Sequence, residues 1–304
     1  MRESELLQHV YDTADGPTRQ VPIPPGDDMA MLLVGEVPVL AAVDQVIDGR
    51  HFDLDTTPLE LVGRKAVTRS LSDVAAMASH PVALLVTVAL PSDFGHDRAT
   101  ALFDAMRETA RYYECPLVGG DITLHRDASS PLVCTVTVLA RPGPAGAVTR
   151  SGARSGDTLY VTGRLGGSLG PDGLGRHLTF EPRISVALGL AENLQTRLHA
   201  MIDISDGLGR DAAHLARCSG VRIEIDAARI PCADGVDWRR AASDGEDYEL
   251  CFAAAGEVPS TLAGVPVTAI GRVFEPGPGT VAPVEIRVGA ESIDATRLGW
   301  EHRS

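Results

Sequence analysis

Apolar and polar positions in the first half of the chain alternate between the period of a strand and the period of a helix. Short apolar runs, the last of them rich in β-branched residues, predict strands over 38–43, 84–90, 116–118 and 131–140. Apolar residues at helical spacing predict helices over 58–79 and 97–113. The first strand should end at Asp44 and the third at Gly119-Gly120-Asp121. This alternation indicates an α/β (α+β) layer structure.

The second half repeats the alternation after a segment that is dense in glycine, proline and serine, residues 141–157. Short apolar runs predict strands over 157–163, 222–227, 249–254 and 265–273. Helical spacing predicts helices over 184–196 and 208–219, and a glycine-rich segment covers 163–175. The sequence therefore predicts two domains, residues 1–147 and 148–304.

Composition removes several classes of function. The chain has 304 residues, 44% of them hydrophobic, and a formal net charge of −14, so it is expected to repel a nucleic-acid backbone. No apolar run approaches the roughly 20 residues that span a bilayer, and the N-terminal residues lack a basic segment followed by an apolar one. We expect no nucleic-acid partner, no membrane and a cytoplasmic protein.

Cysteine and lysine usage narrow the chemistry further. The five cysteines are scattered without a CxxC pair, which argues against a disulfide framework and a zinc site and predicts small buried apolar residues. Lys65 is the only lysine among 27 basic residues, and it does not stand in a phosphate-binding P-loop. The protein-kinase signature is also absent. If the protein handles ATP, it does so by another route.

Acidic residues repeatedly stand beside glycine, at predicted strand ends or in apolar stretches. They are Asp27, Asp28, Asp44, Asp73, Asp121, Asp203, Asp206, Glu246 and Asp247. Carboxylates that converge in such places repel one another unless cations lie between them. Several hard oxygen ligands suit Mg²⁺, and adjacent glycines allow backbone N–H groups to approach phosphate oxygens.

Each of these residues also has an ordinary structural interpretation. Asp27 and Asp28 can form a cap or an Asx-turn, and Ser205-Asp206-Gly207 is typical of a helix N-cap. Arg150 can be a surface charge or a clamp for phosphate oxygens. Phe103 can be a core residue of its helix or can stack on an adenine, and His51 can be a simple loop residue. The hypothesis of a shared site therefore depends on the order and combination of these residues.

Taken in order, these segments resemble the thiamine-monophosphate kinase family, which belongs to the ATP-binding superfamily of aminoimidazole ribonucleotide synthetase and selenophosphate synthetase. The matching blocks cover nearly the whole chain. They are Pro25-Gly26-Asp27-Asp28, Asp44 with Asp48-Gly49-Arg50-His51-Phe52, Leu71-Ser72-Asp73-Val74-Ala75-Ala76-Met77, Pro116-Leu117-Val118-Gly119-Gly120-Asp121, Arg150-Ser151-Gly152-Ala153, Glu181-Pro182-Arg183, Met201-Ile202-Asp203-Ile204-Ser205-Asp206-Gly207-Leu208, Gly245-Glu246-Asp247-Tyr248-Glu249-Leu250 and the tail Gly299-Trp300-Glu301-His302.

The resemblance implies a two-domain aminoimidazole-ribonucleotide-synthetase-like fold with a C-terminal α/β sandwich. It also implies a homodimer in which the N-terminal sheets pair, and ATP-dependent phosphorylation of thiamine monophosphate to thiamine diphosphate with several Mg²⁺ ions. The N-terminal domain would bind ATP and Mg²⁺ and form the dimer, and the C-terminal domain would complete the site. By position it implies magnesium ligands at Asp27, Asp44, Asp73, Asp121, Asp203 and Asp206, with Asp44 and Asp121 catalytic; ATP contacts at Phe103, Gly120, Asp121, Arg150 and Ser205; and substrate contacts at His51, Glu246 and Trp300.

Departures from the family pattern keep rival functions open. Ala42 and Val43 stand where the family usually carries hydroxyl residues, and Gln45 replaces a small hydroxyl residue. One metal position would therefore lose a side-chain oxygen. The alternatives are a sister enzyme of the superfamily with another substrate, a non-catalytic nucleotide- or metal-binding homodimer, and an acidic structural protein with solvated carboxylates.

Overall fold

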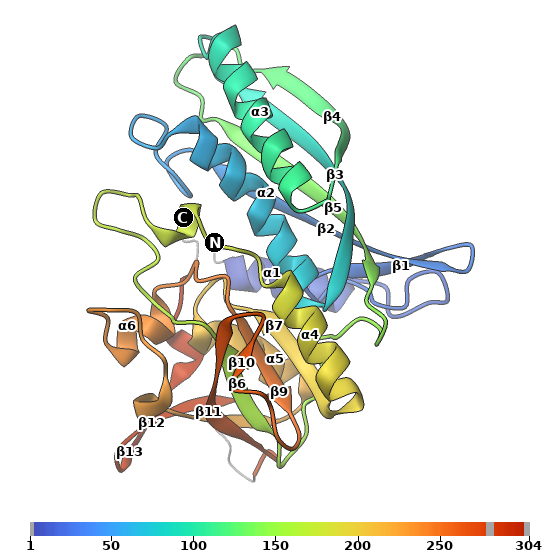
Figure 1. Cartoon of the computed structure of the whole chain (residues 1–304), viewed down its shortest axis with the longest axis vertical. Coiled ribbons are helices and arrows are strands. Elements are labelled where there is room, and N and C mark those ends of the chain that lie inside the picture. The colour runs from blue at the N-terminus through green and yellow to red at the C-terminus, as the bar shows by residue number, and fades with distance from the viewer. Residues whose placement is uncertain (1–2, 278–282, 301–304) are drawn as a thin grey trace.

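The chain folds into two mixed α/β halves, each built around its own β-sheet (Figure 1). This computed structural model describes residues 3–277 and 283–300. The N-terminal half carries a five-stranded sheet in the order β1-β2-β5-β3-β4, in which β3 and β4 are parallel and the other pairs antiparallel. Its strands are β1 Ala30–Val34, β2 Val37–Ile47, β3 Ser79–Leu90, β4 Leu117–Leu124 and β5 Val133–Pro142.

Two helices, α2 (Leu59–Ala76) and α3 (His96–Tyr112), cover one face of the N-terminal sheet (Figure 1). Their approach is close because Gly63 of α2 leaves no side chain between them: a Cβ there would lie 2.9 Å from the Cβ of Ala105. The other face of the sheet is uncovered and exposes Val43 and Leu85. α2 therefore lies between the N-terminal sheet and the rest of the molecule.

The C-terminal half is built on a sheet with the strand order β13-β12-β8-β11-β6-β9-β7, with β10 paired to β11. The strands are β6 Thr158–Thr162, β7 Leu198–Asp203, β8 Arg222–Asp226, β9 Leu250–Ala254, β10 Thr261–Leu262, β11 Val265–Phe274, β12 Val284–Val288 and β13 Glu291–Asp294. The helices of this half are α4 Ile184–Leu194, α5 Leu208–Ser219 and α6 Trp238–Ser243.

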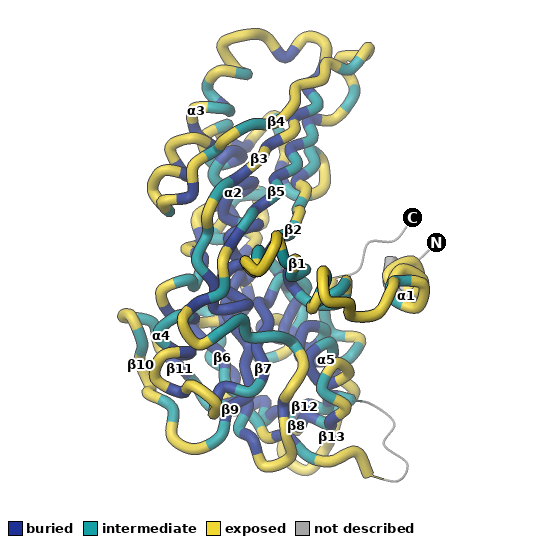
Figure 2. The backbone as a smooth tube through the Cα atoms, turned by 90° about the vertical axis from the view of Figure 1, so that its right-hand side faces the viewer, coloured by how far each residue is buried: buried dark blue, intermediate teal, exposed yellow. Residues whose placement is uncertain are grey.

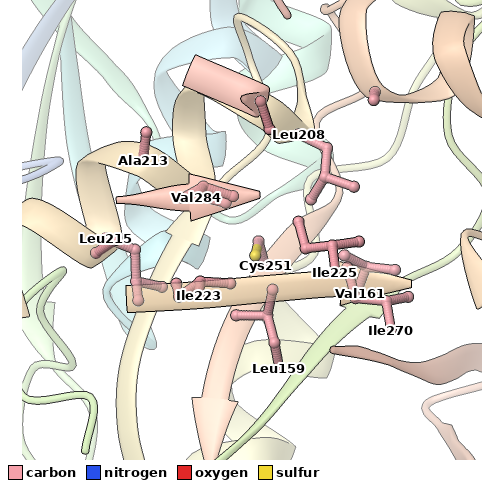
Figure 3. Close-up of a cluster of buried hydrophobic side chains, with 14 of the residues drawn as sticks. Leu159, Val161, Leu208, Ala213, Leu215, Ile223, Ile225, Cys251, Ile270 and Val284 are labelled. Atoms are coloured by element: carbon pink, nitrogen blue, oxygen red, sulfur yellow. The ribbon is translucent and has the colours of Figure 1, made fainter. Parts of the chain in front are cut away.

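This second sheet is buried on both faces, as the alternation along β9 shows. Cys251 points into the hydrophobic cluster that packs against α5. Figure 3 shows this cluster, with Cys251 beside Leu159 and Ile223. Leu250 and Phe252 point the other way, into the cluster that packs against α4. Because successive side chains of a strand point to opposite faces, this pattern requires a layer on each side. The predicted α/β fold class is confirmed.

The end of α2 joins the two halves. Ala75 and Ala78 share a core with residues of α4, and the Ser72 hydroxyl donates to Asp203 Oδ2 across 2.6 Å. Asp203 is the last residue of β7, so this contact brings a helix of the first half onto a strand end of the second. Loops from both halves consequently meet around the C-terminal turns of α2.

The predicted strand ends at Asp44 and Asp121 are wrong. Asp44 lies inside β2, which continues to Ile47, and Asp121 lies inside β4, which continues to Leu124. In both cases pairing with a neighbouring strand carries the extended backbone past a polar residue. The sequence patterns also missed several elements: α1 Glu3–Thr13, β1, β7, α6, β10, β12 and β13.

Three of the cysteines, Cys115, Cys134 and Cys251, are buried as predicted. For Cys218 the prediction is wrong, because the last turn of α5 exposes it to solvent. Figure 2 shows α1 at the side of the molecule, where Leu6 and Leu7 remain exposed. Within the described part of the chain, no helix combines the length and the apolar character that a membrane crossing requires.

Candidate functional site

Three carboxylates from distant parts of the sequence converge where the two halves meet. Asp28 lies in the loop before β1, Asp73 in the last turn of α2 and Asp203 at the end of β7. One oxygen of each lies within 4.8 Å of the others. The sequence analysis singled out Asp73 and Asp203 as ligands but chose Asp27 in place of its neighbour Asp28. We call Asp28, Asp73 and Asp203 the acidic cluster.

Burial and mutual repulsion raise the pKa values of Asp27, Asp73 and Asp203. Burial, followed by the charges of Asp44 and Asp203, raises the pKa of Asp73 well above its usual range. Burial and the charge of Asp28 raise the pKa of Asp203 to about 7. The pKa of Asp27 rises to about 6 for the same two reasons. A nearby cation would favour the ionised forms of these carboxyl groups. The arrangement therefore favours binding of a cation.

The side chain of Arg150 places a positive charge next to the acidic cluster. Its Nη2 lies 2.8 Å from Asp28 Oδ1, and its backbone N–H donates to Asp27 Oδ1 and Oδ2 at 3.2 and 3.1 Å. Even so, Arg150 Nε, Asp28 Oδ2 and Asp44 Oδ2 are among the buried polar atoms of the described residues without a hydrogen-bond partner. Buried polar atoms normally have partners, and an all-oxygen donor set fits Mg²⁺.

Asp44 approaches the acidic cluster from the sheet. It pairs with Val136 in the β2–β5 register, and Val136 is buried on the face that α2 covers. Its Oδ1 accepts a hydrogen bond from Arg69 Nε of α2 at 3.1 Å. Asp44 and three neighbouring carboxylates, Asp28, Asp73 and Asp203, therefore lie on the same side of the N-terminal sheet.

A pocket of about 310 Å³ opens beside this region. Five residues that the sequence analysis proposed line it, namely His51, Ser205, Asp206, Glu246 and Trp300. The remaining lining residues are Gly49, Arg50, Phe52, Asp53, Arg69, Leu169, Gly173, Asp244, Gly245 and Tyr248. The walls thus come from both halves of the chain, and Ser205 and Asp206 stand two and three residues after Asp203 of the acidic cluster.

The loop after β7 is fixed by a residue that the sequence analysis overlooked. Asp211 Oδ2 accepts hydrogen bonds from the backbone N–H groups of Ser205, Asp206 and Gly207, at 3.0, 3.1 and 3.0 Å. The N-cap of α5 is Gly207, which has no side-chain cap. The interpretation of Ser205 as an N-cap is therefore wrong, and Ser205 lines the pocket instead.

Glu246 is held at the pocket wall by basic and imidazole groups from other elements. Lys65 Nζ lies 2.6 Å from Glu246 Oε2, and His177 Nδ1 lies 3.0 Å from the same atom. These two partners lower the pKa of Glu246 to about 2 against the opposing effect of burial. Sequence reasoning missed both partners; the available signal was a single lysine on an apolar helix face.

Three of the predicted site residues lie elsewhere in this chain. Asp121 pairs with Thr87, and Thr87 with Thr135, on the uncovered face of the N-terminal sheet, opposite to Asp44. Gly120 packs against β3 so closely that a Cβ would lie 1.7 Å from Val86 O. Phe103 packs on the N-terminal core from α3, as its structural interpretation predicts. None of the three lines the pocket.

The positions that depart from the family pattern divide between the two faces of β2. Ala42 packs against the N-terminal core. Val43 is 62% exposed on the uncovered face. Gln45 lies on that same face, where its Nε2 donates to Thr135 Oγ1 at 3.0 Å. Neither Val43 nor Gln45 therefore removes a side-chain oxygen from the face on which Asp44 approaches the acidic cluster.

Comparison with known proteins matches both halves to one family. The AIR synthase related protein, N-terminal domain, matches residues 26–141, and the corresponding C-terminal domain matches residues 154–282. The chain is 35% identical to the thiamine-monophosphate kinase of Rhodopirellula baltica over 85% of this chain and 86% of that protein. It is 32% identical to that of Escherichia coli K12, over 89% and 90% of the two chains.

Solved structures give the same picture. The chain is similar to AaThiL complexed with AMPPCP and TMP, with a TM-score of 0.78 and 28% identity over 99% of this chain and 96% of the other. It is also similar to thiamine monophosphate kinase from Aquifex aeolicus, with a TM-score of 0.73 and 27% identity over 94% and 98% of the two chains. The hydrogenase maturation protein HypE, at 18% identity and a TM-score of 0.71, covering 89% and 84%, shares the fold.

Proposed function

Because the chain belongs to the AIR synthase related family, and within it to the thiamine-monophosphate kinases, we propose that it phosphorylates thiamine monophosphate to thiamine diphosphate with ATP. The observation that carries the proposal is the acidic cluster beside a 310 Å³ pocket, joined to it by the loop after Asp203. A cluster that binds metal–nucleotide and a pocket that binds the acceptor are the two parts that such a transfer needs.

Mg²⁺ is the metal that these residues would hold. Asp28, Asp73 and Asp203 would be the inner ligands, with Asp27, Asp44 and Asp206 around them. The unpartnered buried oxygens of Asp28 and Asp44 support this assignment. When bound, the ions would neutralise the phosphate charges that otherwise keep two anionic substrates apart. Ser205 and Arg150 remain the predicted ATP contacts on this side of the sheet.

The acceptor is already an anionic phosphate oxygen, so the chain needs no strong general base. An acceptor oxygen forms a bond to the γ-phosphorus in line with the departing β,γ-bridging oxygen, and ADP leaves with the electron pair. The chain's contribution is orientation and charge: Arg69 holds Asp44, and Arg150 holds Asp28. These ion pairs fix the carboxylates before substrate arrives, which avoids reorganisation during transfer.

The charge and the aromatic residue at the pocket suit the acceptor. Thiamine monophosphate carries a cationic thiazolium ring and a second aromatic ring. The ionised carboxylate of Glu246 complements the cation, Trp300 offers an aromatic surface, and His51 lines the same pocket. Phe103, Gly120 and Asp121 do not line this pocket. Because Asp121 lies on the uncovered face of the sheet, its predicted contacts would be made with the site of a second chain.

We propose further that the chain forms a homodimer through its N-terminal sheet. β4 is an edge strand whose Val118, Ile122 and Leu124 are 62%, 58% and 65% exposed. A hydrophobic, unpaired edge is a template for pairing with another chain. In this arrangement residues 1–147 would form the dimerisation and nucleotide domain, and residues 148–304 would complete each site.

The direct test is to incubate the purified protein with Mg²⁺, ATP and thiamine monophosphate and to separate the thiamine species by chromatography. We expect thiamine diphosphate and ADP in equal amounts. Asp73→Asn should abolish product, whereas Asp234→Asn, at a carboxylate that is 98% exposed, should not change the rate. Binding of Mg²⁺–ATP by calorimetry without any product would contradict the proposal and favour a non-catalytic binding protein or another acceptor.

A further inference from the structure

The only lysine of the chain is buried beneath the pocket without lining it. Lys65 lies on α2 and is fully buried. A buried ammonium is strongly unfavourable unless each of its protons meets an acceptor. The choice of lysine here, in a chain that otherwise uses arginine, therefore calls for a geometric reason.

The reason is that three polar atoms from separate segments surround the ammonium. Lys65 Nζ lies 2.8 Å from the backbone oxygen of His51, 2.6 Å from Glu246 Oε2 and 2.8 Å from His177 Nδ1. A compact ammonium can point its donors in three separate directions, whereas a planar guanidinium cannot. Lysine is thus the side chain that this cavity fits.

The same geometry places His177 between the ammonium and the glycine-rich segment. Its Nδ1 lies 2.8 Å from Lys65 Nζ and 3.0 Å from Glu246 Oε2. Nε2 lies 3.1 Å from the backbone oxygen of Gly173 and donates to it. His177 is fully buried in the short 3-10 helix Arg176–Leu178. The His177 ring therefore links Lys65 and Glu246 to the glycine-rich segment.

These bonds reach three separate walls of one pocket. His51, Gly173 and Glu246 all line the 310 Å³ pocket, while Lys65 and His177 do not. His51 precedes α2, Gly173 belongs to the glycine-rich segment 163–175, and Glu246 belongs to the loop before β9. The two buried residues connect these segments from behind the wall.

The glycine-rich segment has the greatest need of such a tether. Gly166, Gly167 and Gly173 have left-handed φ values of 81°, 68° and 78°. Its Leu169 also lines the pocket and is 58% exposed. Glycines raise the entropy that ordering removes, and an exposed leucine adds little packing of its own. The bond from His177 to Gly173 is therefore one of the contacts that keep this wall in place.

We propose that Lys65 and His177 are positioning residues that set the shape of the acceptor pocket: they aim the Glu246 carboxylate and hold the glycine-rich segment as a pocket wall. The inference rests on the proposed function in assigning thiamine monophosphate to this pocket. It predicts that loss of either residue weakens recognition of the acceptor and leaves recognition of ATP unchanged.

The kinetic test compares three substitutions with a control on the same helix. Lys65→Met removes the ammonium, His177→Gln keeps a donor near Nε2 and His177→Asn keeps an acceptor near Nδ1. Arg64→Gln is the control, because Arg64 bonds Phe180 O and Glu181 Oε1 at 2.8 and 2.6 Å and does not line the pocket. We expect KM for thiamine monophosphate to rise about tenfold or more in the three variants, with KM for ATP within about twofold.

Hydrogen exchange of the ligand-free protein gives a readout that does not depend on catalysis. Residues 163–175 should exchange faster in Lys65→Met and His177→Asn and at the wild-type rate in Arg64→Gln. If Lys65→Met does not fold, the two His177 variants, which leave the Lys65–Glu246 ion pair in place, test the same tether. If the exchange rates and KM values of the Lys65 and His177 variants match those of Arg64→Gln, the inference would be overturned. If the wild-type chain forms no thiamine diphosphate, but residues 163–175 exchange faster in the variants as expected, the proposed function alone would be overturned.

Discussion

Each carboxylate of the acidic cluster is destabilised by the others as long as no divalent cation lies among them. Arg150 neutralises part of the charge through Asp28, but the pKa of Asp203 still stands at about 7 because of burial and the remaining charges. The folded protein therefore holds charges that the unfolded chain would separate. Mg²⁺ should consequently stabilise the fold as well as support the reaction.

Replacing Asp73 by asparagine should separate these two effects. Asp73→Asn removes one like charge, so we expect the chelator-treated protein to gain about 1 kcal/mol and its Tm to rise by about 2 °C. The stabilisation of the wild type by Mg²⁺ should largely disappear in the variant. Thermal unfolding with EDTA and with Mg²⁺ measures both, and Asp234→Asn serves as the control. An undiminished shift with Mg²⁺ would exclude Asp73 as a ligand.

His214 of α5 should make the protein sensitive to acid. Burial, followed by the charges of Arg150, Arg217 and Arg210, lowers its pKa from 6.5 to about 3. Below pH 6.5 the unfolded chain takes up a proton that the folded chain binds only near pH 3. The stability contributed by neutral His214 is therefore complete above pH 6.5 and is lost as pH falls, by at most about 1.4 kcal/mol per pH unit.

The substitution His214→Gln should flatten this pH dependence. We expect the difference in unfolding free energy between pH 7 and pH 5 to shrink by about 1 to 2 kcal/mol relative to the wild type. Urea unfolding at a series of pH values provides the measurement. His96→Gln, at an imidazole that is 92% exposed, should leave the profile unchanged; an equal effect in both variants would contradict the assignment.

At this scale the sequence indicates which types of residue form the site but not which side chain turns inward. Asp27 and Asp28 are neighbours, and the choice between them depends on the Arg150 backbone, which engages Asp27 and leaves Asp28 to face the cluster. That contact joins residues 123 positions apart. Lys65 and His177 were missed for the same reason, because their role depends on polar contacts that only the fold brings together.

Among the elements, α4 is tied to the C-terminal sheet by a buried ion pair. Arg183, at the start of α4, donates to Glu249 through Nε and Nη2, at 2.7 and 2.5 Å. Thr162 of β6 donates to Glu249 Oε2 at 2.7 Å. Gly163 makes room for this carboxylate, because a Cβ there would lie 2.1 Å from Glu249 Oε1. One carboxylate thus links a helix and two strands.

Arg183→Met should destabilise the protein by about 3 kcal/mol, because it leaves Glu249 buried with most of its charge uncompensated. The double variant Arg183→Met/Glu249→Met should recover much of that loss, since it removes the second charge as well. Urea unfolding of the two single variants and the double variant forms a double-mutant cycle. Strictly additive losses in the double variant would show that the pair is not coupled.

Periodicity predicted the elements whose patterns are long and regular and failed where tertiary contacts extend a strand. α2, α3, α5 and β5 follow their apolar spacing closely. The strand β7 was missed because its six residues are followed at once by the polar loop of the site. Asp44 and Asp121 ended predicted strands because polar residues usually do so, whereas register with neighbouring strands continues both.

At the scale of the whole molecule, the N-terminal sheet separates two residues for which the family resemblance implies one site. The row Asp44–Val136–Val86–Gly120 crosses the sheet on the face that α2 covers, and the adjacent row Gln45–Thr135–Thr87–Asp121 crosses it on the open face. Neighbouring positions of a strand point to opposite faces. In the homodimer proposed above, Asp121 would therefore serve the site of the partner chain, a placement that no sequence pattern could reveal.

This placement predicts that two inactive variants restore activity when they are combined. If Asp121 acts in the site of the partner chain, a heterodimer of Asp73→Asn and Asp121→Asn contains one site with both carboxylates intact. Half of the randomly mixed dimers are heterodimers with one of two sites intact, so about a quarter of wild-type activity should return after the chains are unfolded and refolded together. If Asp121 acted within its own chain, every site of every mixed dimer would lack one carboxylate, and no activity would return. Ile122→Glu, on the same edge strand, provides the control. Chains that also carry this substitution should fold but should not form dimers, and no activity should then return.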